Sequence, residues 1–126
     1  MNLLAHFAIS WRQLKAALVD KVLNHRIQYH NPTLRSHYSV IWNYGYHWLD
    51  SIKLGRNVVV MAHAEIVVYK HTPHSGKEGA FIAGDNAVIG TGVNLRAAGG
   101  LIQLGNNSGI GELSVVVAAN HAIEKG

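Results

Sequence analysis

The chain has 126 residues, 48% of them hydrophobic, a size and composition that fit one domain with a modest core and exclude a disordered protein. It contains no cysteine, which excludes disulfides and thiolate chemistry and leaves His, Asp and Glu as metal ligands. The net charge of +4 comes from basic residues scattered along the chain. Such mild basicity suits an anionic small ligand, whereas nucleic-acid binding would need a basic stripe.

An amphipathic helix is predicted from Leu3 to about Leu23. Apolar residues recur in steps of three and four, the period of one helix face, at Leu4, Phe7, Trp11, Leu14, Leu18 and Val22. The polar face carries Arg12, Lys15, Lys21 and Arg26, a pattern that also permits contact with a membrane surface. We expect the helix instead to pack against the rest of the domain or a neighbouring subunit.

The sequence predicts neither a signal peptide nor a membrane span. Residues 1–9 are apolar, but they lack a basic region and are not followed by a small-residue cleavage site. Nowhere do 18 consecutive apolar residues occur. We therefore expect a cytoplasmic protein.

The segment 33–51 is predicted to cover the open end of a core. Asn31-Pro32 ends the helical pattern, because the ring of Pro32 disfavours helix at Asn31. The segment is rich in aromatic residues, with Tyr38, Trp42, Tyr44, Tyr46 and Trp48 placed around Gly45. An aromatic box for a ligand is the alternative interpretation. Residues 1–51 would thus form an N-terminal helix and aromatic cap region.

A hexapeptide repeat begins after residue 51. Three stretches align with one another, namely LGRNVVV at 54–60, AGDNAVI at 83–89 and LGNNSGI at 104–110. Extended in sixes, their leading positions form three groups: Leu54, Val60 and Ile66; Ala83, Ile89 and Leu95; Leu104, Ile110 and Val116. The groups start 29 and 21 residues apart, which indicates coils of 18 residues separated by two insertions.

This pattern predicts an all-β triangular solenoid over residues 52–126, with a loop insertion at 72–82. The leading residue of each hexad would point inward and stack on its counterpart one coil away, at the strand spacing of about 4.8 Å. Gly and Asn within each hexad would supply the backbone conformations that the corners need. A sandwich of alternating strands is the competing fold, but it gives no reason for a period of six.

The hexads resemble those of the hexapeptide-repeat acyltransferases, over roughly residues 52 to 121. Within that superfamily the run LGNNSGIGELSVVVAANH, residues 104–121, is most similar to the maltose, galactoside, xenobiotic and polysaccharide O-acetyltransferases. The resemblance implies a left-handed parallel β-helix of about three 18-residue coils that assembles as a homotrimer. It also implies acetyl transfer from acetyl-CoA to a hydroxyl of a sugar or polysaccharide precursor, without a metal.

Three residues are candidates for the site that this resemblance implies. His121 stands where the family carries its general base, and a neutral imidazole suits that task because its ordinary pKa lies near neutral pH. Asn94 is similar to the asparagine with which galactoside-type members hold the acceptor, and Asn120 is a second candidate for substrate binding. The acidic residues that follow this asparagine in those members are replaced here by Gly99-Gly100, which leaves the acceptor open.

Two alternatives to an acetyltransferase use the same fold. One is a γ-class carbonic anhydrase, which needs two histidines five residues apart on one coil; His121 has Val116 and Gly126 at those distances, and His71 and His74 lie in the insertion. The other is a non-catalytic trimeric scaffold. Only residues 122–126 follow His121, whereas related enzymes continue with coils that build much of the coenzyme A site, so the chain is expected to be a truncated form.

Overall fold

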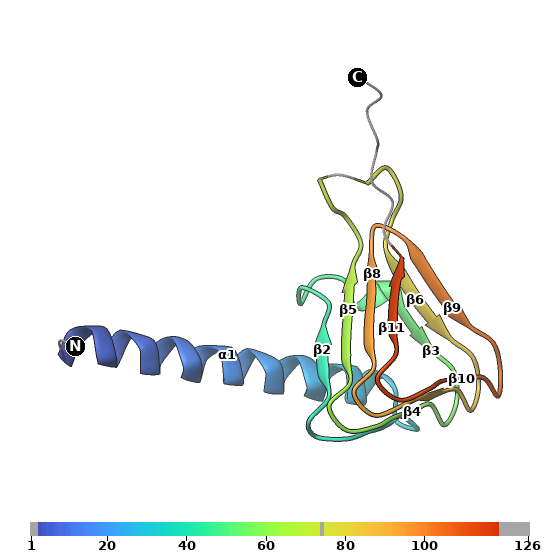
Figure 1. The fold of residues 1–126 in the computed structure, drawn as a ribbon, viewed down its shortest axis with the longest axis horizontal. Coiled ribbons are helices and arrows are strands. Elements are labelled where there is room, and N and C mark those ends of the chain that lie inside the picture. The colour runs from blue at the N-terminus through green and yellow to red at the C-terminus, as the bar shows by residue number, and fades with distance from the viewer. Residues whose placement is uncertain (1–2, 74, 119–126) are drawn as a thin grey trace.

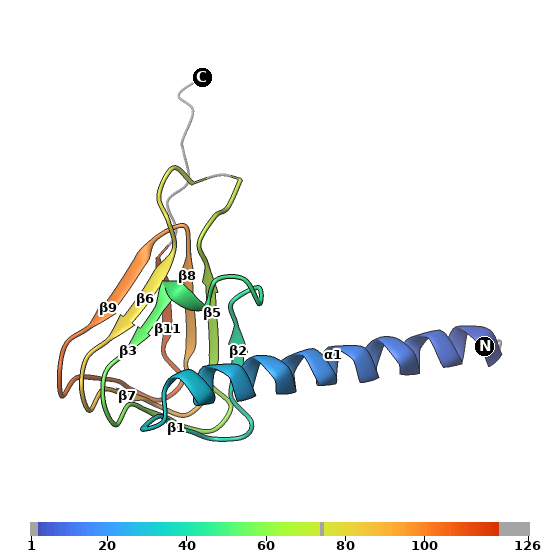
Figure 2. The same cartoon turned by 180° about the vertical axis from the view of Figure 1, so that it is seen from behind.

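The body of the protein is a three-sided solenoid of short parallel strands, with one long helix extending from it (Figure 1). The structure is a computed structural model that describes residues 3–73 and 75–118. The helix α1 spans Leu3–His30, and a short 3₁₀ turn spans Leu49–Ser51. The view from behind shows the last turns of α1 crossing the end of the solenoid, while its first turns project beyond the body (Figure 2).

The strands form three parallel sheets, one for each side of the triangle. The first contains β1 (Arg35–Ser36), β4 (Val59–Val60), β7 (Val88–Ile89) and β10 (Gly109–Ile110). The second contains β2 (Ile41–Asn43), β5 (Glu65–Tyr69), β8 (Asn94–Ala98) and β11 (Val115–Ala118). The third contains β3 (Ile52–Leu54), β6 (Ala80–Ala83) and β9 (Leu101–Leu104). The chain visits the three sheets in rotation, so the fold is a parallel β-helix-like solenoid.

The predicted stacking of the hexads is confirmed in register. Ala83 pairs with both Leu54 and Leu104, Ile89 with Val60 and Ile110, and Leu95 with Ile66 and Val116. The middle member of each column is almost completely buried, as expected for side chains enclosed on all sides. These three columns form the centre of the hydrophobic core.

Two corners of each coil use the left-handed backbone conformation, at the fourth position of its first and second hexads. Positive φ angles occur at Asn57, His63, Asn86, Gly92, Asn107 and Leu113. Gly and Asn tolerate this conformation, which is why they recur in the repeat, whereas Leu113 adopts it at a steric cost.

At the corner formed by the first hexads, polar side chains link each coil to the preceding one. Asp85 Oδ1 accepts the backbone N–H of Arg56 at 2.8 Å, and Asn106 Oδ1 accepts that of Asp85 at 2.8 Å. The corners approach so closely that a Cβ on Gly84 would lie 2.6 Å from the Asn106 nitrogen. Glycine is therefore required at positions 55 and 84, where the corner of the following coil leaves no room for a Cβ.

The parallel ladders begin before the boundary expected at residue 52. In β1 and β2, Ser36 pairs with Val60 and Trp42 pairs with Ile66, so this segment continues the inward columns upstream. Trp42 lies in the core, and its indole N–H donates to Ser36 Oγ at 3.1 Å. The aromatic residues of the expected cap differ in burial, because Trp42 and Tyr44 are buried core residues while Tyr38 is 88% exposed.

The end of the solenoid is closed by the last turns of α1. Leu23 and Ile27 are the buried residues of this helix, and they join the core cluster. Tyr44 Oη donates to the carbonyl of Leu23 at 2.8 Å, and Asn24 Nδ2 donates to the carbonyl of Val40 at 3.0 Å. Burial raises the pKa of Tyr44, so its hydroxyl keeps its proton and this hydrogen bond at neutral pH.

The helix is longer than the sequence predicts and packs less. It continues past Leu23 to His30, and residues 3–22 are all exposed, so the expected packing against the domain is limited to the last turns. Within the part of the chain that the structure describes, no helix combines the length and hydrophobicity that crossing a membrane requires.

A projecting loop, residues 70–79, lies where the insertion at 72–82 was expected. It emerges between β5 and β6 and stands away from the body (Figure 1). The strand β6 begins at Ala80, and Phe81 is fully buried between Ile52 and Ile102, so residues 80–82 belong to the solenoid. Lys77 and His71 are exposed, and His74 lies outside the described residues.

Gly84→Ala is expected to lower the free energy of unfolding by about 1–3 kcal/mol, because its Cβ overlaps backbone atoms of the next corner. The matched control is Gly105→Ala, at the same hexad position, where a Cβ meets no described atom within 4 Å. The control should leave stability unchanged or raise it by up to about 1 kcal/mol. Urea denaturation of both variants measures the difference, and equal destabilisation would contradict the crowding of the corners.

Candidate functional site

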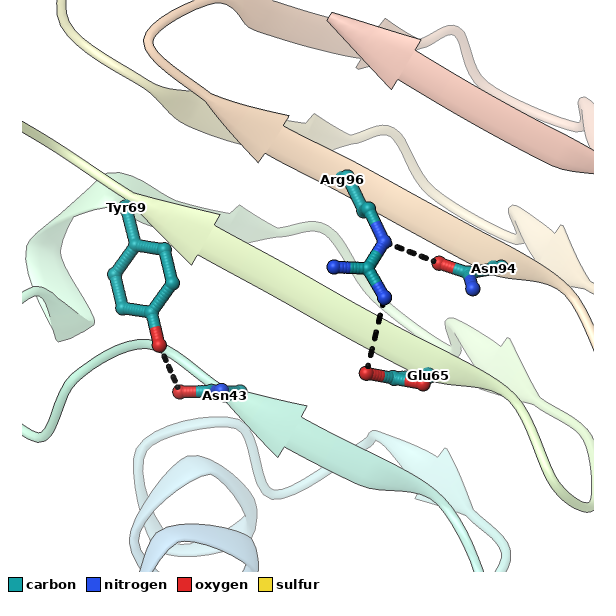
Figure 3. A network of polar contacts seen from close by, with 5 residues as sticks. All are labelled: Asn43, Glu65, Tyr69, Asn94 and Arg96. Carbon is teal, nitrogen blue, oxygen red and sulfur yellow. Dashed lines mark hydrogen bonds and ion pairs between the residues drawn. The ribbon is translucent and has the colours of Figure 1, made fainter. Parts of the chain in front are cut away.

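Polar side chains gather on the outer face of the β2–β5–β8–β11 sheet. Asn43, Glu65, Tyr69, Asn94 and Arg96 lie on this face, and we call them the polar face (Figure 3). They come from three neighbouring strands whose inward residues fill the core. Because alternate residues of a strand point to opposite sides, each strand can contribute both to the core and to this surface.

Arg96 connects two of these side chains. Its Nε donates to Asn94 Oδ1 at 3.0 Å, and its Nη2 lies 3.5 Å from Glu65 Oε1. Glu65 and Asn94 are directly opposite each other in the register, so the guanidinium reaches across from the neighbouring row. The side chains of Arg96 and Glu65 are 47% and 37% exposed, which leaves this ion pair accessible to a ligand from solvent.

A second pair lies at the other side of the polar face. Tyr69 Oη donates to Asn43 Oδ1 at 2.9 Å, and the rings of Tyr69 and Trp48 form a T-shaped pair with centroids 5.2 Å apart. Between the two groups, Val67 is only 4% exposed and pairs with Asn43 and Arg96 in one row. The face therefore offers donors and acceptors around a covered apolar centre.

Sequence reasoning found one member of the polar face and missed the other four. Asn94 is on it, as a residue of β8 that is partly buried. Glu65 and Arg96 each lie one residue from an inward hexad position, Ile66 and Leu95, so the repeat itself marks them as outward. Glu65 and Asn94 each stand one residue before a hexad start, and these starts, Ile66 and Leu95, are 29 residues apart. Aligning the coils would therefore have placed Glu65 opposite Asn94, as the structure does.

The candidate base His121 and its neighbour Asn120 lie outside the described residues. The strand before them, β11, pairs Val115 with Asn94 and ends at Ala118, opposite Ala97. Asn94 is therefore three residues, about 10 Å, from the point where the described part of this strand ends. Along the sheet, the described end of β11 is closer to Ala97 and Ala98 than to Asn94.

A separate cavity of about 610 Å³ lies between the end of α1 and β3. Basic and imidazole side chains of Arg26, His30, His47 and Lys53 line it, together with the carboxylate of Asp50. None of the polar-face residues lines this cavity. Asp50 is paired with Lys70 at 3.4 Å, which offsets part of the local charge.

Within residues 3–73 and 75–118, no three His, Asp or Glu side chains lie together in a group that could hold a metal ion. Comparisons with known protein families, with curated proteins and with solved structures found no match to the chain.

Removing the Arg96 side-chain charge is expected to cost little stability. Because the ion pair is exposed, Arg96→Gln should change the free energy of unfolding by less than about 1 kcal/mol. Leu95→Ala, at the adjacent buried position, should cost about 2–5 kcal/mol. Urea denaturation compares the two; a loss above about 2 kcal/mol for Arg96→Gln would show that the polar face serves the fold and not a ligand.

Proposed function

We propose that this protein transfers an acetyl group from acetyl-CoA to a hydroxyl of a sugar or polysaccharide precursor. The observation that carries the proposal is the stacking of the hexads, since the register follows the columns expected from the acyltransferase-like repeat. The similarity of residues 104–121 to the O-acetyltransferases supplies the chemistry. The net charge of +4 favours an anionic co-substrate such as acetyl-CoA.

We propose further that the solenoid is left-handed and that three copies assemble, as the resemblance implies. The 18-residue coil with single left-handed residues at its corners supports the first part, because it matches the hexapeptide solenoids in coil length and corner chemistry. A cytoplasmic location fits a reaction that consumes acetyl-CoA.

In this proposal His121 acts as the general base. Its neutral imidazole takes the proton from the acceptor hydroxyl as that oxygen attacks the thioester carbonyl carbon. A new carbon–oxygen bond forms, the carbon–sulfur bond breaks, and the proton passes from the imidazole to the departing thiolate. A backbone N–H stabilises the negative charge that develops on the carbonyl oxygen.

Asn94 and Asn120 are proposed to bind the acceptor. The bond from Arg96 Nε already engages Asn94 Oδ1, so the Nδ2 hydrogens of Asn94 are oriented to donate to a ligand on the polar face. The carboxylate of Glu65 lies opposite and can accept from a sugar hydroxyl. The sugar substrate would thus meet a hydrogen-bond donor on Asn94 and a hydrogen-bond acceptor on Glu65, on adjacent strands.

His121→Ala is expected to lower the rate of coenzyme A release from acetyl-CoA, in the presence of saccharide acceptors, by about 10²–10⁴-fold. The matched control, His6→Ala, removes an exposed histidine from the first turns of α1 and should keep the wild-type rate. Calorimetry with acetyl-CoA should give the same dissociation constant for all three proteins. An active His121→Ala variant would remove this residue from the reaction, and a wild-type protein that binds no acetyl-CoA would favour a non-catalytic scaffold.

A further inference from the structure

The cavity of about 610 Å³ between the end of α1 and β3 gathers basic and imidazole side chains from separate parts of the chain. Arg26 and His30 come from the last turns of α1, His47 from the turn after β2, and Lys53 from β3. A volume of this size falls within the range of small-molecule sites, about 300–1,000 Å³. Residues of three segments therefore converge on one space that a small ligand can enter.

Arg26 is held in place by the turn that follows β2. Its Nη1 donates to the carbonyl oxygen of Tyr46, and its guanidinium carbon lies 4.7 Å from the centre of the Tyr46 ring. Within the described residues its side chain makes this one hydrogen bond, so the other N–H groups of the guanidinium remain for a ligand. A guanidinium fixed in advance loses little further freedom when it binds an anion.

The turn that holds Arg26 adopts an unfavourable backbone conformation. Gly45 and Tyr46 both have positive φ, 59° and 63°. A Cβ on Gly45 would lie 2.9 Å from the ring of Trp48, so glycine is needed there. Tyr46 adopts the left-handed region with a full side chain, which is sterically costly. Strain of this kind persists where the surrounding structure holds it, and it is concentrated at ligand-binding sites.

The cavity is positively charged although a carboxylate borders it. Arg26 and Lys53 carry one positive charge each, and Asp50 is the one acidic residue among the described residues that line the cavity. Asp50 Oδ2 lies 3.4 Å from Nζ of Lys70, which does not line this cavity, so its charge is offset from outside. Lys53 forms no ion pair within residues 3–73 and 75–118. Its ammonium group therefore remains for a ligand.

The carbonyl end of α1 also borders the cavity, and its partial negative charge opposes the binding of an anion. Side-chain and backbone donors reduce this effect. Asn31 Nδ2 donates to the carbonyl of Ile27 at 2.9 Å, and the backbone N–H of Asn31 donates to that of Gln28 at 3.2 Å. Both carbonyls belong to the last turn of the helix, where no partner within the helix is available. The cationic side chains thus dominate the potential in the cavity.

Charge and shape together favour a phosphomonoester over other anions. A phosphate monoester carries about −1.5 to −2 charges at neutral pH, whereas a single carboxylate would leave one of the two cations unpaired. The planar guanidinium of Arg26 matches two phosphate oxygens at once, and the ammonium of Lys53 binds phosphate as a point charge. The cavity also has an apolar lining for the organic part of a ligand, formed by Leu49, Ile52 and Leu54.

We propose that this cavity binds the phosphate group of a small organic phosphomonoester through Arg26 and Lys53. His30 and His47 supply further N–H donors around it. The site is separate from the proposed acetyl transfer, because none of the polar-face residues lines the cavity. Binding alone therefore tests the proposal, and no acetyl transfer is required.

Phenyl phosphate is the probe, and its binding to the full chain is measured by calorimetry. Lys53→Gln removes one of the two charged contacts at an exposed position of β3 and should weaken binding about 10-fold. Lys77→Gln is the matched control, because it makes the same change of charge at an exposed residue of the projecting loop and should keep the wild-type affinity. Benzoate, which has a ring but a single negative charge, should bind the wild-type protein about 10-fold more weakly.

Equal affinities of the two lysine variants for phenyl phosphate would overturn the proposal. So would a wild-type protein that shows no saturable binding up to about 10 mM probe, which is weaker than any specific contact of this kind predicts. Benzoate that binds as tightly as phenyl phosphate would overturn the choice of a phosphate.

Two competitors test whose phosphate the cavity binds. Acetyl-CoA at high concentration should leave the affinity for phenyl phosphate unchanged, and displacement would make the cavity part of the coenzyme site and overturn its independence. Vesicles that contain phosphatidic acid present the same phosphate group on a lipid. They should not displace the probe either; displacement would assign the site to a lipid headgroup and overturn the choice of a small soluble ligand.

Discussion

Parallel strand pairing holds each coil of this protein against the next, and a side chain at every sixth position fills the space between them. The columns centred on Ala83, Ile89 and Leu95 run through successive coils on the three sides of the triangle. In such an array each coil is stabilised chiefly by its neighbours. The corners, the closing helix and the polar face are all positioned by this stacking.

The closing helix follows from the same constraint. A terminal coil has a neighbour on one side only, so its apolar end needs another cover. Leu23 and Ile27 of α1 provide it, and the hydrogen bonds from Tyr44 and Asn24 fix the crossing of the helix over the first coil. The preceding part of α1, residues 3–22, is exposed and does not contribute to this cover.

The repeat predicts the solenoid well because its signal is periodic and its spacing sets the register. It fails at the first turn, where Ser36, which pairs with Val60, stands in place of the aliphatic residue of its column. The aromatic residues there suggest a cap, yet Trp42 fills an ordinary inward position. The sequence pattern also does not predict that α1 continues to His30, because Ile27 is the one buried apolar residue among residues 24–30.

The polar face is harder to predict than the core, for a physical reason. Periodicity shows that Glu65, Tyr69 and Arg96 point outward, but an outward position accepts many residue types. Which of them meet depends on side-chain reach across strands, as when Arg96 contacts a residue in the row beside its own. Asn94 was found only through resemblance, and the structure adds the neighbours that would orient it.

The corner hydrogen bonds carry a consequence for how this sequence can change over evolutionary time. Asp85 serves a backbone donor 29 residues earlier in the chain, and Asn106 serves one 21 residues earlier. A substitution at either position leaves an N–H without its acceptor on a different coil, while its own coil keeps its core. Positions 85 and 106 are therefore expected to keep a side chain that accepts a hydrogen bond, although they are exposed and their own coils do not require it.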